Sequence, residues 1–381
     1  MVRWPGPATV FPVRILIVGG GVLGTLHAWQ AVERGHEVVQ LEREPEARGA
    51  SVRNFGLVWV GGRASGVELT TALRARELWQ RIGERVPGIG FRANGSLTVL
   101  RTDAEYAVAQ GVATETGRGF KLLDPAEVRA LNPALQGDFL GALSCDLDAA
   151  VEPRVAQPAL RAVLAESGRY TWLPGREVRE LTGQGVVDDR GERHGADVVL
   201  FCTGAWLGGL VKELTGPAPV RRVRLQMAQT EPLGEPLTTS VADADSFRYY
   251  PAYRGAALDA LNQDQPQPPI AAGHRMQLLM VQRLDGGLTI GDTHEYDEPF
   301  SFDVTEDPYD HLSEVAGALL GRPLPRIVRR WAGVYAQATD PALVVHRAKV
   351  ADNAWLVTGP GGRGMTCSPA IAEDTAEELG L

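Results

Sequence analysis

Apolar and glycine-rich stretches alternate at the start of the chain in the order expected for a strand, a helix and a second strand. An apolar run from Ile15 to Val18 predicts a buried strand, and the helix-compatible segment behind it extends to about Arg34. Gly35 follows that helix, and a second apolar run ends at Glu42. The pattern therefore predicts one βαβ unit within residues 14–42.

Past residue 42 the pattern changes repeatedly between helical and strand periodicity. Apolar residues at three- and four-residue spacing predict helices at residues 68–85, 158–166, 306–320 and from about residue 368 onward. Strands are predicted at residues 91–100, 172–189, 197–210, 220–232, 277–292, 330–340 and 354–358, and the segment 197–210 runs into a turn and a helix. A hairpin is expected around Asp285-Gly286-Gly287, and the Gln/Pro-rich residues 262–269 are interpreted as a surface loop.

The turn of the βαβ unit has the spacing G-x-G-x-x-G at Gly19, Gly21 and Gly24. Gly19 permits a tight turn, Gly21 lets the backbone approach a pyrophosphate, and Gly24 lets the helix pack closely on the strand. The helix N-terminus directs amide donors at the phosphates. Glu42 can accept the two ribose hydroxyls and would repel a 2′-phosphate, which favours FAD or NAD over NADP. The motif alone does not choose between FAD and NAD.

Composition narrows the class of protein. A chain of 381 residues suits two domains, and a net charge of −9 argues against a nucleic-acid partner. The three cysteines are far apart and no HExxH spacing occurs, so we expect no disulfide framework, no metal site and a cytoplasmic location. No apolar run reaches the ~20 residues that span a bilayer, so no membrane partner is expected. Residues 1–12 lack the apolar core of a signal peptide and are interpreted as a flexible leader.

Four separated segments resemble the FAD-dependent D-amino-acid oxidase, glycine oxidase and sarcosine oxidase group. The opening βαβ unit resembles its FAD fingerprint, and Cys202-Thr203-Gly204-Ala205-Trp206 resembles its second "A-T-G-A-W" segment. Trp331-Ala332-Gly333 resembles the "W-A-G" strand before the substrate site, and residues 359–369 resemble the glycine-rich segment that holds the flavin edge.

The resemblance implies an α/β fold with a discontinuous Rossmann-like FAD domain and a substrate domain built on a large mixed antiparallel sheet. We assign residues 1–85, 145–218 and 330–381 to the FAD-binding domain and residues 86–144 and 219–329 to the substrate domain. It also implies oxidation of the C–N bond of a small primary or secondary amine by hydride transfer to flavin. Hydrolysis of the imine follows, with molecular oxygen or another electron acceptor, and the resemblance implies release of peroxide.

Three departures from the family pattern affect this expectation. In the amino-acid oxidases an arginine follows the W-A-G strand and clamps the substrate carboxylate, whereas Tyr335 stands near that place here. The closing segment has no lysine to form the same clamp. Gly333 stands where sarcosine oxidases carry a flavin-tethering cysteine, so we expect non-covalent FAD. Residues 51–56, 291–296 and 364–366 resemble a bacterial branch associated with aminophosphonate breakdown, which makes an aminoalkylphosphonate a possible substrate.

The candidate site residues follow from the motifs and the resemblance. The expected cofactor contacts are Gly19, Gly21, Gly24, Glu42, Arg43, Ser51, Arg53, Asn54, Val178, Thr203, Gly204, Trp206, Gly362, Arg363, Gly364 and Met365. The expected catalytic and substrate residues are Arg275, His294, Tyr335 and Tyr250, with Tyr249 as a further aromatic wall and Arg53 as a second candidate for the substrate anion. A dry aromatic surround would favour the deprotonated amine, and arginine or histidine would hold an anion.

Each of these residues also has an ordinary structural interpretation. The tyrosines could be core residues of a sheet, Arg275 could lie on the surface, and His294 could satisfy a turn with Asp292. Two other functions stay open at this point: an NAD-dependent dehydrogenase, which leaves the closing glycines unexplained, and a non-catalytic FAD-binding subunit.

Overall fold

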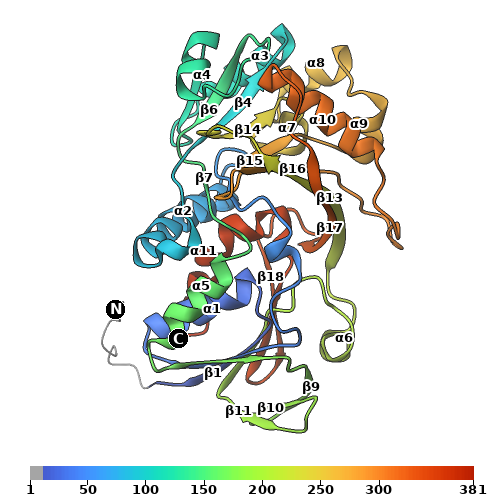
Figure 1. Ribbon diagram of the computed structural model, residues 1–381. Helices are drawn as coiled ribbons and strands as arrows, with labels where there is room; N and C mark the ends of the chain where they lie inside the picture. The colour runs from blue at the N-terminus through green and yellow to red at the C-terminus, as the bar shows by residue number, and fades with distance from the viewer. Residues whose placement is uncertain (1–11) are drawn as a thin grey trace.

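A mainly parallel sheet of six strands forms one half of the protein in a computed structural model, which describes residues 12–381 (Figure 1). β1 (Arg14–Val18) lies in the middle of this sheet, with β2 (Glu37–Glu42) on one side and β12 (Val198–Phe201) on the other. The sheet continues with β8 (Tyr170–Pro174) beyond β2, and with β19 (Ala354–Thr358) and the antiparallel β18 (His346–Ala351) beyond β12. The central strands are apolar because both faces of this sheet are covered.

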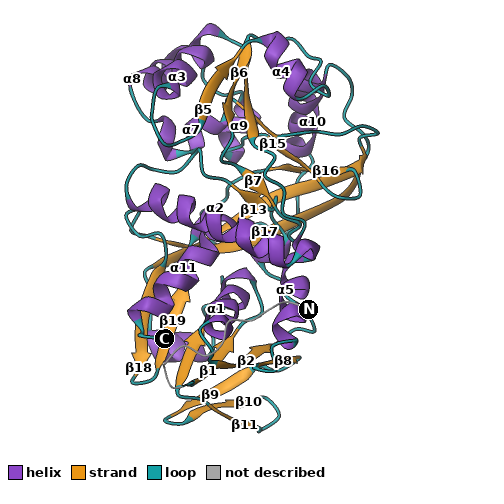
Figure 2. Cartoon of the chain, turned by 90° about the vertical axis from the view of Figure 1, so that its left-hand side faces the viewer, coloured by secondary structure: helices purple, strands orange, loops and turns teal. Residues whose placement is uncertain are grey.

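Helices pack on this sheet and on one another between the two halves. α1 (Val22–Glu33) is buried over nearly its whole length, with Leu26 and Trp29 in the core. It packs against α11 (Gly364–Glu378), which in turn packs against α2 (Val67–Arg85). The views in Figures 1 and 2 show α11 and α2 between the six-stranded sheet and the other half. Other elements of this half are α5 (Ala156–Ala165), α6 (Leu210–Thr215), the pair β3 (Leu57–Val58) and β7 (Ala149–Ala150), and a small sheet of β9 (Val178–Thr182), β10 (Gly185–Asp188) and β11 (Arg193–Gly195).

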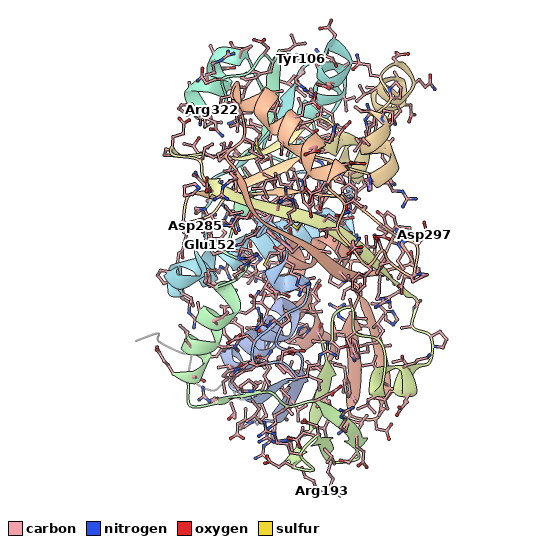
Figure 3. The ribbon with its side chains drawn as sticks, turned by 45° about the vertical axis from the view of Figure 1, so that its right-hand side comes forward. Tyr106, Glu152, Arg193, Asp285, Asp297 and Arg322 are labelled. Carbon is pink, nitrogen blue, oxygen red and sulfur yellow. The ribbon has the colours of Figure 1, made fainter. Side chains whose placement is uncertain are left out.

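The other half is built on an eight-stranded sheet, in which every neighbouring pair is antiparallel except β14 and β4. In spatial order its strands are β17 (Ile327–Ala338), β13 (Val220–Pro232), β16 (Gly287–Gly291), β15 (Leu279–Gln282), β14 (Ser240–Asp243), β4 (Ser96–Leu100), β6 (Gly141–Cys145) and β5 (Phe120–Leu123). Its helices are α3 (Asp103–Ala113), α4 (Pro125–Leu131), α7 (Ser246–Tyr249), α8 (Ala256–Asp264), α9 (Pro269–His274) and α10 (Asp307–Leu320). Figure 3 shows Tyr106 of α3 at one end of the molecule and Arg193 of β11 at the other.

The two longest strands, β13 and β17, extend the large sheet over the first half. They pair in antiparallel register, with Val223 opposite Tyr335 and Leu225 opposite Gly333. Alternate residues of a strand point to opposite faces, so Val223, Leu225 and Tyr335 share one face. That face is turned toward the closing turn, the 3₁₀ turn Gly361–Arg363 and the start of α11. The two sheets thus meet over the glycine-rich end of the first half.

The predicted fold class is confirmed, including the βαβ unit and the large mixed sheet. Two predicted boundaries are wrong. Residues 262–269 are not one loop, because Asn262 to Asp264 complete α8, whose Leu258 and Leu261 are buried, and Pro269 begins α9. The last helix begins at Gly364 rather than near residue 368.

The domain assignment stays a prediction. By sheet membership its boundary at residue 330 falls inside β17, a strand of the eight-stranded sheet. The expected N-terminal leader lies outside the described residues, apart from residue 12. Among residues 12–381, no helix combines the length and the apolar character that a bilayer crossing requires.

Asp148 ties the two halves together through a buried carboxylate. One of its oxygens accepts hydrogen bonds from the backbone N–H groups of Val60 and Gly61, and the other accepts the hydroxyl of Ser96 on β4. Its side chain is fully buried. Because a buried donor that loses its acceptor costs about 1–3 kcal/mol, Asp148→Ala should destabilise the fold by roughly 2–5 kcal/mol.

The measurement is thermal unfolding of the purified wild type and of two variants, Asp148→Ala and the control Asp146→Ala. We expect a midpoint several degrees lower for Asp148→Ala than for the wild type. Asp146→Ala is the matched control, since Asp146 is two residues away with an exposed side chain and only a 3.8 Å ion pair to Lys121. Equal midpoints for the two variants would contradict this role of Asp148.

Candidate active site

A single cavity of about 730 Å³ lies between the two sheets. It begins at the turn after β1, passes under β13 and β17, and ends among aromatic side chains, of which Tyr335 belongs to the eight-stranded sheet. Its volume is in the range of cofactor and substrate sites, which span ~300–1,000 Å³. The ends of the cavity have different chemistry, so we describe them separately.

At the first end, the turn of the G-x-G-x-x-G motif can be built only with glycine. Gly19 has φ +116°, and a Cβ atom there would lie 2.4 Å from the carbonyl oxygen of Cys202. A Cβ at Gly24 would lie 2.2 Å from the carbonyl oxygen of Gly19. Gln40 Nε2 donates to that same oxygen at 2.8 Å. The turn is therefore held against β12 and presents backbone to the cavity, as a pyrophosphate requires.

The side chains around this turn also suit a dinucleotide. Glu42 lines the cavity, where its carboxylate accepts hydrogen bonds from the N–H groups of Gly20 at 2.7 Å and Glu44 at 3.1 Å. Ser51 Oγ accepts the N–H of Val22 in the first turn of α1 at 2.9 Å. These residues fit FAD, because they combine a helix N-terminus, a backbone cradle and a carboxylate in ribose position.

An arginine and a tryptophan cover the outer part of this end. The guanidinium of Arg43 lies 4.1 Å from the ring centroid of Trp206, and both residues line the cavity. Thr203 donates its hydroxyl to the carbonyl oxygen of Trp206, which fixes the turn after β12. Val178, at the start of β9, forms the facing wall.

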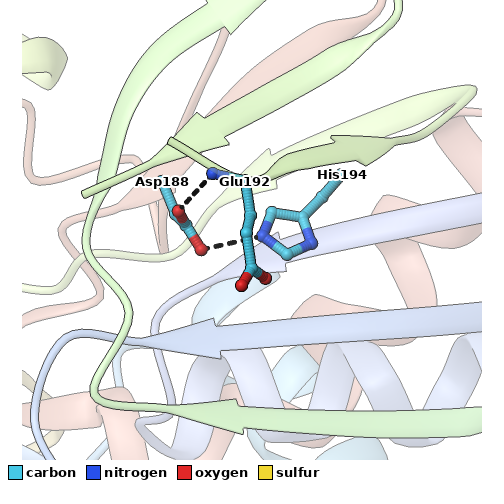
Figure 4. Close-up of side chains that lie close together, drawn as sticks. All are labelled: Asp188, Glu192 and His194. Atoms are coloured by element: carbon cyan, nitrogen blue, oxygen red, sulfur yellow. Dashed lines mark hydrogen bonds and ion pairs between the residues drawn. The ribbon is translucent and has the colours of Figure 1, made fainter. Parts of the chain in front are cut away.

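The neighbouring small sheet contains a cluster of metal-ligand types, shown in Figure 4. Asp188, Glu192 and His194 place ligand atoms within 4.8 Å of one another. Arg176 Nη1 lies 2.5 Å from Asp188 and 2.8 Å from Glu192, so a guanidinium already supplies the positive charge. Burial acts to raise the pKa of Asp188, but hydrogen bonds from His194, the Glu192 N–H and Arg176 outweigh it and lower that pKa. The cluster links the three strands β9, β10 and β11 of the small sheet beside Val178.

At the other end, aromatic side chains enclose what we call the aromatic chamber: Trp59, Tyr249, Tyr250, His294 and Tyr335. The hydroxyl oxygens of Tyr249 and Tyr335 are 3.4 Å apart, and the His294 ring stacks on Tyr249 with centroids 4.2 Å apart. Trp59 stacks on Tyr250 at 5.5 Å. Burial raises the pKa of all three tyrosines, so their hydroxyls are neutral at physiological pH.

Two polar residues complete the chamber. Asp292 is buried, with Gln277 Nε2 at 3.4 Å from its Oδ1 and His294 Nε2 at 3.9 Å from its Oδ2. His294 Nδ1 contacts the carbonyl oxygen of Arg275 at 3.0 Å. Burial raises the pKa of the Asp292 carboxyl. The carbonyl oxygen of the Gln277 side chain is buried without a hydrogen-bond partner among the described residues.

The structure brings most of the predicted residues together in this cavity. Those that line it are Gly19, Gly21, Glu42, Arg43, Ser51, Arg53, Asn54, Val178, Thr203, Gly204, Trp206, Tyr249, Tyr250, His294, Tyr335, Gly362, Gly364 and Met365. Gly24 lies just behind it and serves the packing role that its spacing predicts.

Two predicted side chains point elsewhere. Arg275 ends α9 in the left-handed conformation with φ 49°, and its guanidinium lies over the Tyr296 ring at 4.9 Å, outside the cavity lining. Arg363 bonds Glu68 at 3.0 Å, the carbonyl oxygen of Leu343 and, within the closing turn, the carbonyl oxygen of Pro360, so its charge is satisfied outside the cavity lining. Among the described residues that line the cavity, neither Arg275 nor Arg363 is present, so neither guanidinium contributes its charge there.

Several cavity residues were not predicted. Trp59, Arg63, Arg222, Met227 and Gln277 line the cavity together with Asp292, which the sequence suggested only as a neighbour of His294. Arg63 gave no local signal, because its role comes from folding: its Nε donates to the carbonyl oxygen of Trp59 at 2.7 Å. Gln277 and Asp292 stand at the two ends of the predicted hairpin, and this position could have indicated that they lie side by side.

Comparison with known proteins now decides the family. The family model described as FAD dependent oxidoreductase matches residues 14–378, nearly the whole chain. The chain belongs to this family of FAD-dependent oxidoreductases. The family settles the choice that the glycine motif left open, because its cofactor is FAD; the alternative of an NAD-dependent dehydrogenase is dropped.

Individual relatives agree over most of the chain. It is 28% identical over 377 residues to a glycine oxidase of Pseudomonas aeruginosa, covering 94% of this chain and 92% of that protein. It is 30% identical over 272 residues to a D-amino-acid oxidase of Streptomyces coelicolor, covering 68% of this chain and 74% of the relative. The solved glycine oxidase of Bacillus cereus has the same fold, with a TM-score of 0.76 at 19% identity over 97% of this chain and 95% of that one.

The glycine turn provides a direct test of FAD binding by this family member. Gly19→Ala should reduce the flavin bound per protein by at least tenfold, because its Cβ would overlap the carbonyl oxygen of Cys202. Gly111→Ala is the control, since no atom lies within 4 Å of the Cβ position there and this residue of α3 does not line the cavity. The measurement is the ratio of flavin to protein absorbance after purification, and a normal ratio for Gly19→Ala would refute the cradle.

Proposed function

We propose that this FAD-dependent oxidoreductase oxidises the C–N bond of a small amine. The observation that carries the proposal is one continuous cavity, which joins the dinucleotide turn at Gly19 to the aromatic chamber around Tyr335. Relatives described as glycine oxidase and D-amino-acid oxidase support the same class of substrate.

Bound FAD would supply the acceptor for a hydride from the carbon next to the substrate nitrogen. The chain contributes the surroundings of that transfer. The rings of Tyr249, Tyr250 and Tyr335 line the cavity and exclude water, which disfavours a charged ammonium and favours the neutral amine that loses a hydride. The imine product then leaves the dry chamber and is hydrolysed by water.

An aminoalkylphosphonate is the substrate that we propose in particular. The three segments that resemble the aminophosphonate-associated branch all border the cavity, through Ser51, His294 and Met365 among others. Two arginines that line the cavity could hold the phosphonate. Arg53 forms no ion pair with any carboxylate that the structure describes, and Arg222 is paired with Glu298, which the anion would have to displace. We propose molecular oxygen as the electron acceptor, with release of peroxide.

The deciding experiment is an anaerobic titration of the purified flavoprotein, followed at the oxidised flavin band. Small primary amines, N-methylated amines and aminoalkylphosphonates are added in turn, and at least one should bleach the band. Subsequent addition of air should restore it and release one peroxide per flavin. A flavin that stays oxidised with every amine would contradict the proposal and favour a non-catalytic FAD-binding subunit.

The absence of a carboxylate clamp leads to a prediction about amino acids. Tyr335, a half-buried neutral phenol, stands near the place of the clamping arginine in the amino-acid oxidases. Glycine and D-alanine should therefore reduce the flavin at least tenfold more slowly than the best aminoalkylphosphonate. The measurement is the anaerobic reduction rate at saturating substrate, and equal rates would show that the clamp is not needed.

The environment of Gly333 predicts that FAD is bound without a covalent tether. A Cβ atom at this position would lie 3.2 Å from Arg53 Cβ and 3.3 Å from the Arg53 carbonyl oxygen, so even a small side chain is crowded. Precipitation of the protein with acid should release all of its flavin into the supernatant. Flavin that stays with the denatured chain would contradict this expectation.

A further inference from the structure

We propose that Asp292 holds the protonated amino group of the substrate and accepts its proton before the C–H bond breaks. The inference rests on the proposed function and adds a catalytic residue to it. It starts from a carboxylate that lines the aromatic chamber and has few partners.

The contacts of Asp292 are too long to neutralise it. The nearest cationic or polar side-chain groups are Gln277 Nε2 at 3.4 Å and His294 Nε2 at 3.9 Å. No arginine or lysine forms an ion pair with Asp292 anywhere in residues 12–381. Buried carboxylates are normally paired with a cation or held by several short hydrogen bonds. A substrate cation would supply the missing partner.

The chamber wall beside Asp292 also offers a hydrogen-bond acceptor to a cationic group. The side-chain carbonyl oxygen of Gln277 is a buried acceptor without a donor. The guanidinium of Arg63, 5.7 Å from the Tyr250 ring centroid, already bonds the Trp59 carbonyl oxygen and faces Glu68 at 3.7 Å. The wall can therefore accept hydrogen bonds from a cationic nitrogen.

The proton transfer follows from the groups that face Asp292. Tyr249, Tyr250 and Tyr335 stay protonated because burial raises their pKa values, and Arg63 is paired with Glu68. Asp292 is thus the carboxylate that faces the substrate nitrogen, with His294 Nε2 3.9 Å from its Oδ2. One N–H bond of the ammonium breaks, and an O–H bond forms on Asp292. The nitrogen keeps the electron pair, and the neutral amine can then give up its α-hydrogen as hydride to FAD.

Binding of a cation that cannot be oxidised tests the site apart from turnover. tert-Butylamine is positively charged near neutral pH and has no hydrogen on its α-carbon, and tert-butanol is its neutral counterpart. Each is titrated into the oxidised holoenzyme, and binding is followed by the change in the flavin spectrum. The wild type should bind tert-butylamine at least tenfold more tightly than tert-butanol, and Asp292→Asn should remove this preference.

Asp243→Asn is the matched control, because Asp243 is a buried carboxylate on β14 of the same sheet but does not line the cavity. It should bind tert-butylamine within twofold of the wild type. If Asp292→Asn does not retain FAD, Gln277→Leu decides instead, with at least threefold weaker binding expected. Unchanged tert-butylamine binding in the variant that retains FAD would overturn the proposal.

The pH profile separates a proton acceptor from a structural residue. In the wild type, kcat/KM should rise as Asp292 ionises and then stay level up to the pKa of the substrate amine, about 10 by analogy with lysine. In Asp292→Asn only the neutral amine reacts, so kcat/KM should rise tenfold per pH unit and come within about threefold of the wild type at pH 10. A constant ratio between the two proteins at all pH values would overturn the proton transfer.

The two proposals can fail separately. If no amine reduces the flavin, the proposed function is wrong, while the tert-butylamine comparison still shows whether Asp292 binds a cation. If amines reduce the flavin but Asp292→Asn has the binding and the pH profile of the wild type, only the role of Asp292 is wrong.

Discussion

The contact between Gly19 and the carbonyl oxygen of Cys202 is the physical constraint on which the arrangement of the site depends. Both residues follow the carboxyl ends of neighbouring parallel strands, β1 and β12, and there is no room for a side chain between them. Backbone alone therefore faces the cavity at this point, and α1 begins directly behind it. A dinucleotide can lie on this edge because no side chain projects from the turn into the space that its pyrophosphate would occupy.

The second half of the molecule completes the site by covering this edge with a sheet of different chemistry. The cradle offers amides, a carboxylate at Glu42 and a guanidinium at Arg43, as a charged cofactor needs. The aromatic chamber offers protonated phenols and a buried carboxylate with few partners, at Asp292. The two ends of one cavity thus have different tasks: the first binds the anionic cofactor, and the second binds the amine substrate. In the account developed above, the cofactor end supplies position and the chamber controls the charge of the substrate.

Local patterns were sufficient to predict the glycine turn and the βαβ unit around it, because these parts are close in sequence. The glycines, the acid at the end of the second strand and the apolar strands each have their own signal. Side-chain direction was harder to predict. Arg275 has a residue type suited to an anion site, but its left-handed conformation at the end of α9 turns it toward Tyr296. Arg363 lies in the predicted turn, yet Glu68 of α2 draws its charge away.

The substrate end depends on pairing between distant segments. Gln277 and Asp292 meet because their backbones hydrogen-bond across the hairpin of β15 and β16, and Tyr335 reaches Tyr249 only through the position of β17. The predicted hairpin gives a signal for the first contact, but the contact of Tyr335 with Tyr249 has none in the sequence. The measurement that tests the account most directly is a crystal structure of the FAD-loaded protein with a bound amine that cannot be oxidised. The account predicts the flavin ring between the closing turn and the inner face of β13 and β17, with the amine nitrogen at hydrogen-bond distance from Asp292. A flavin ring outside the cavity, or an amine directed away from the aromatic chamber, would contradict it.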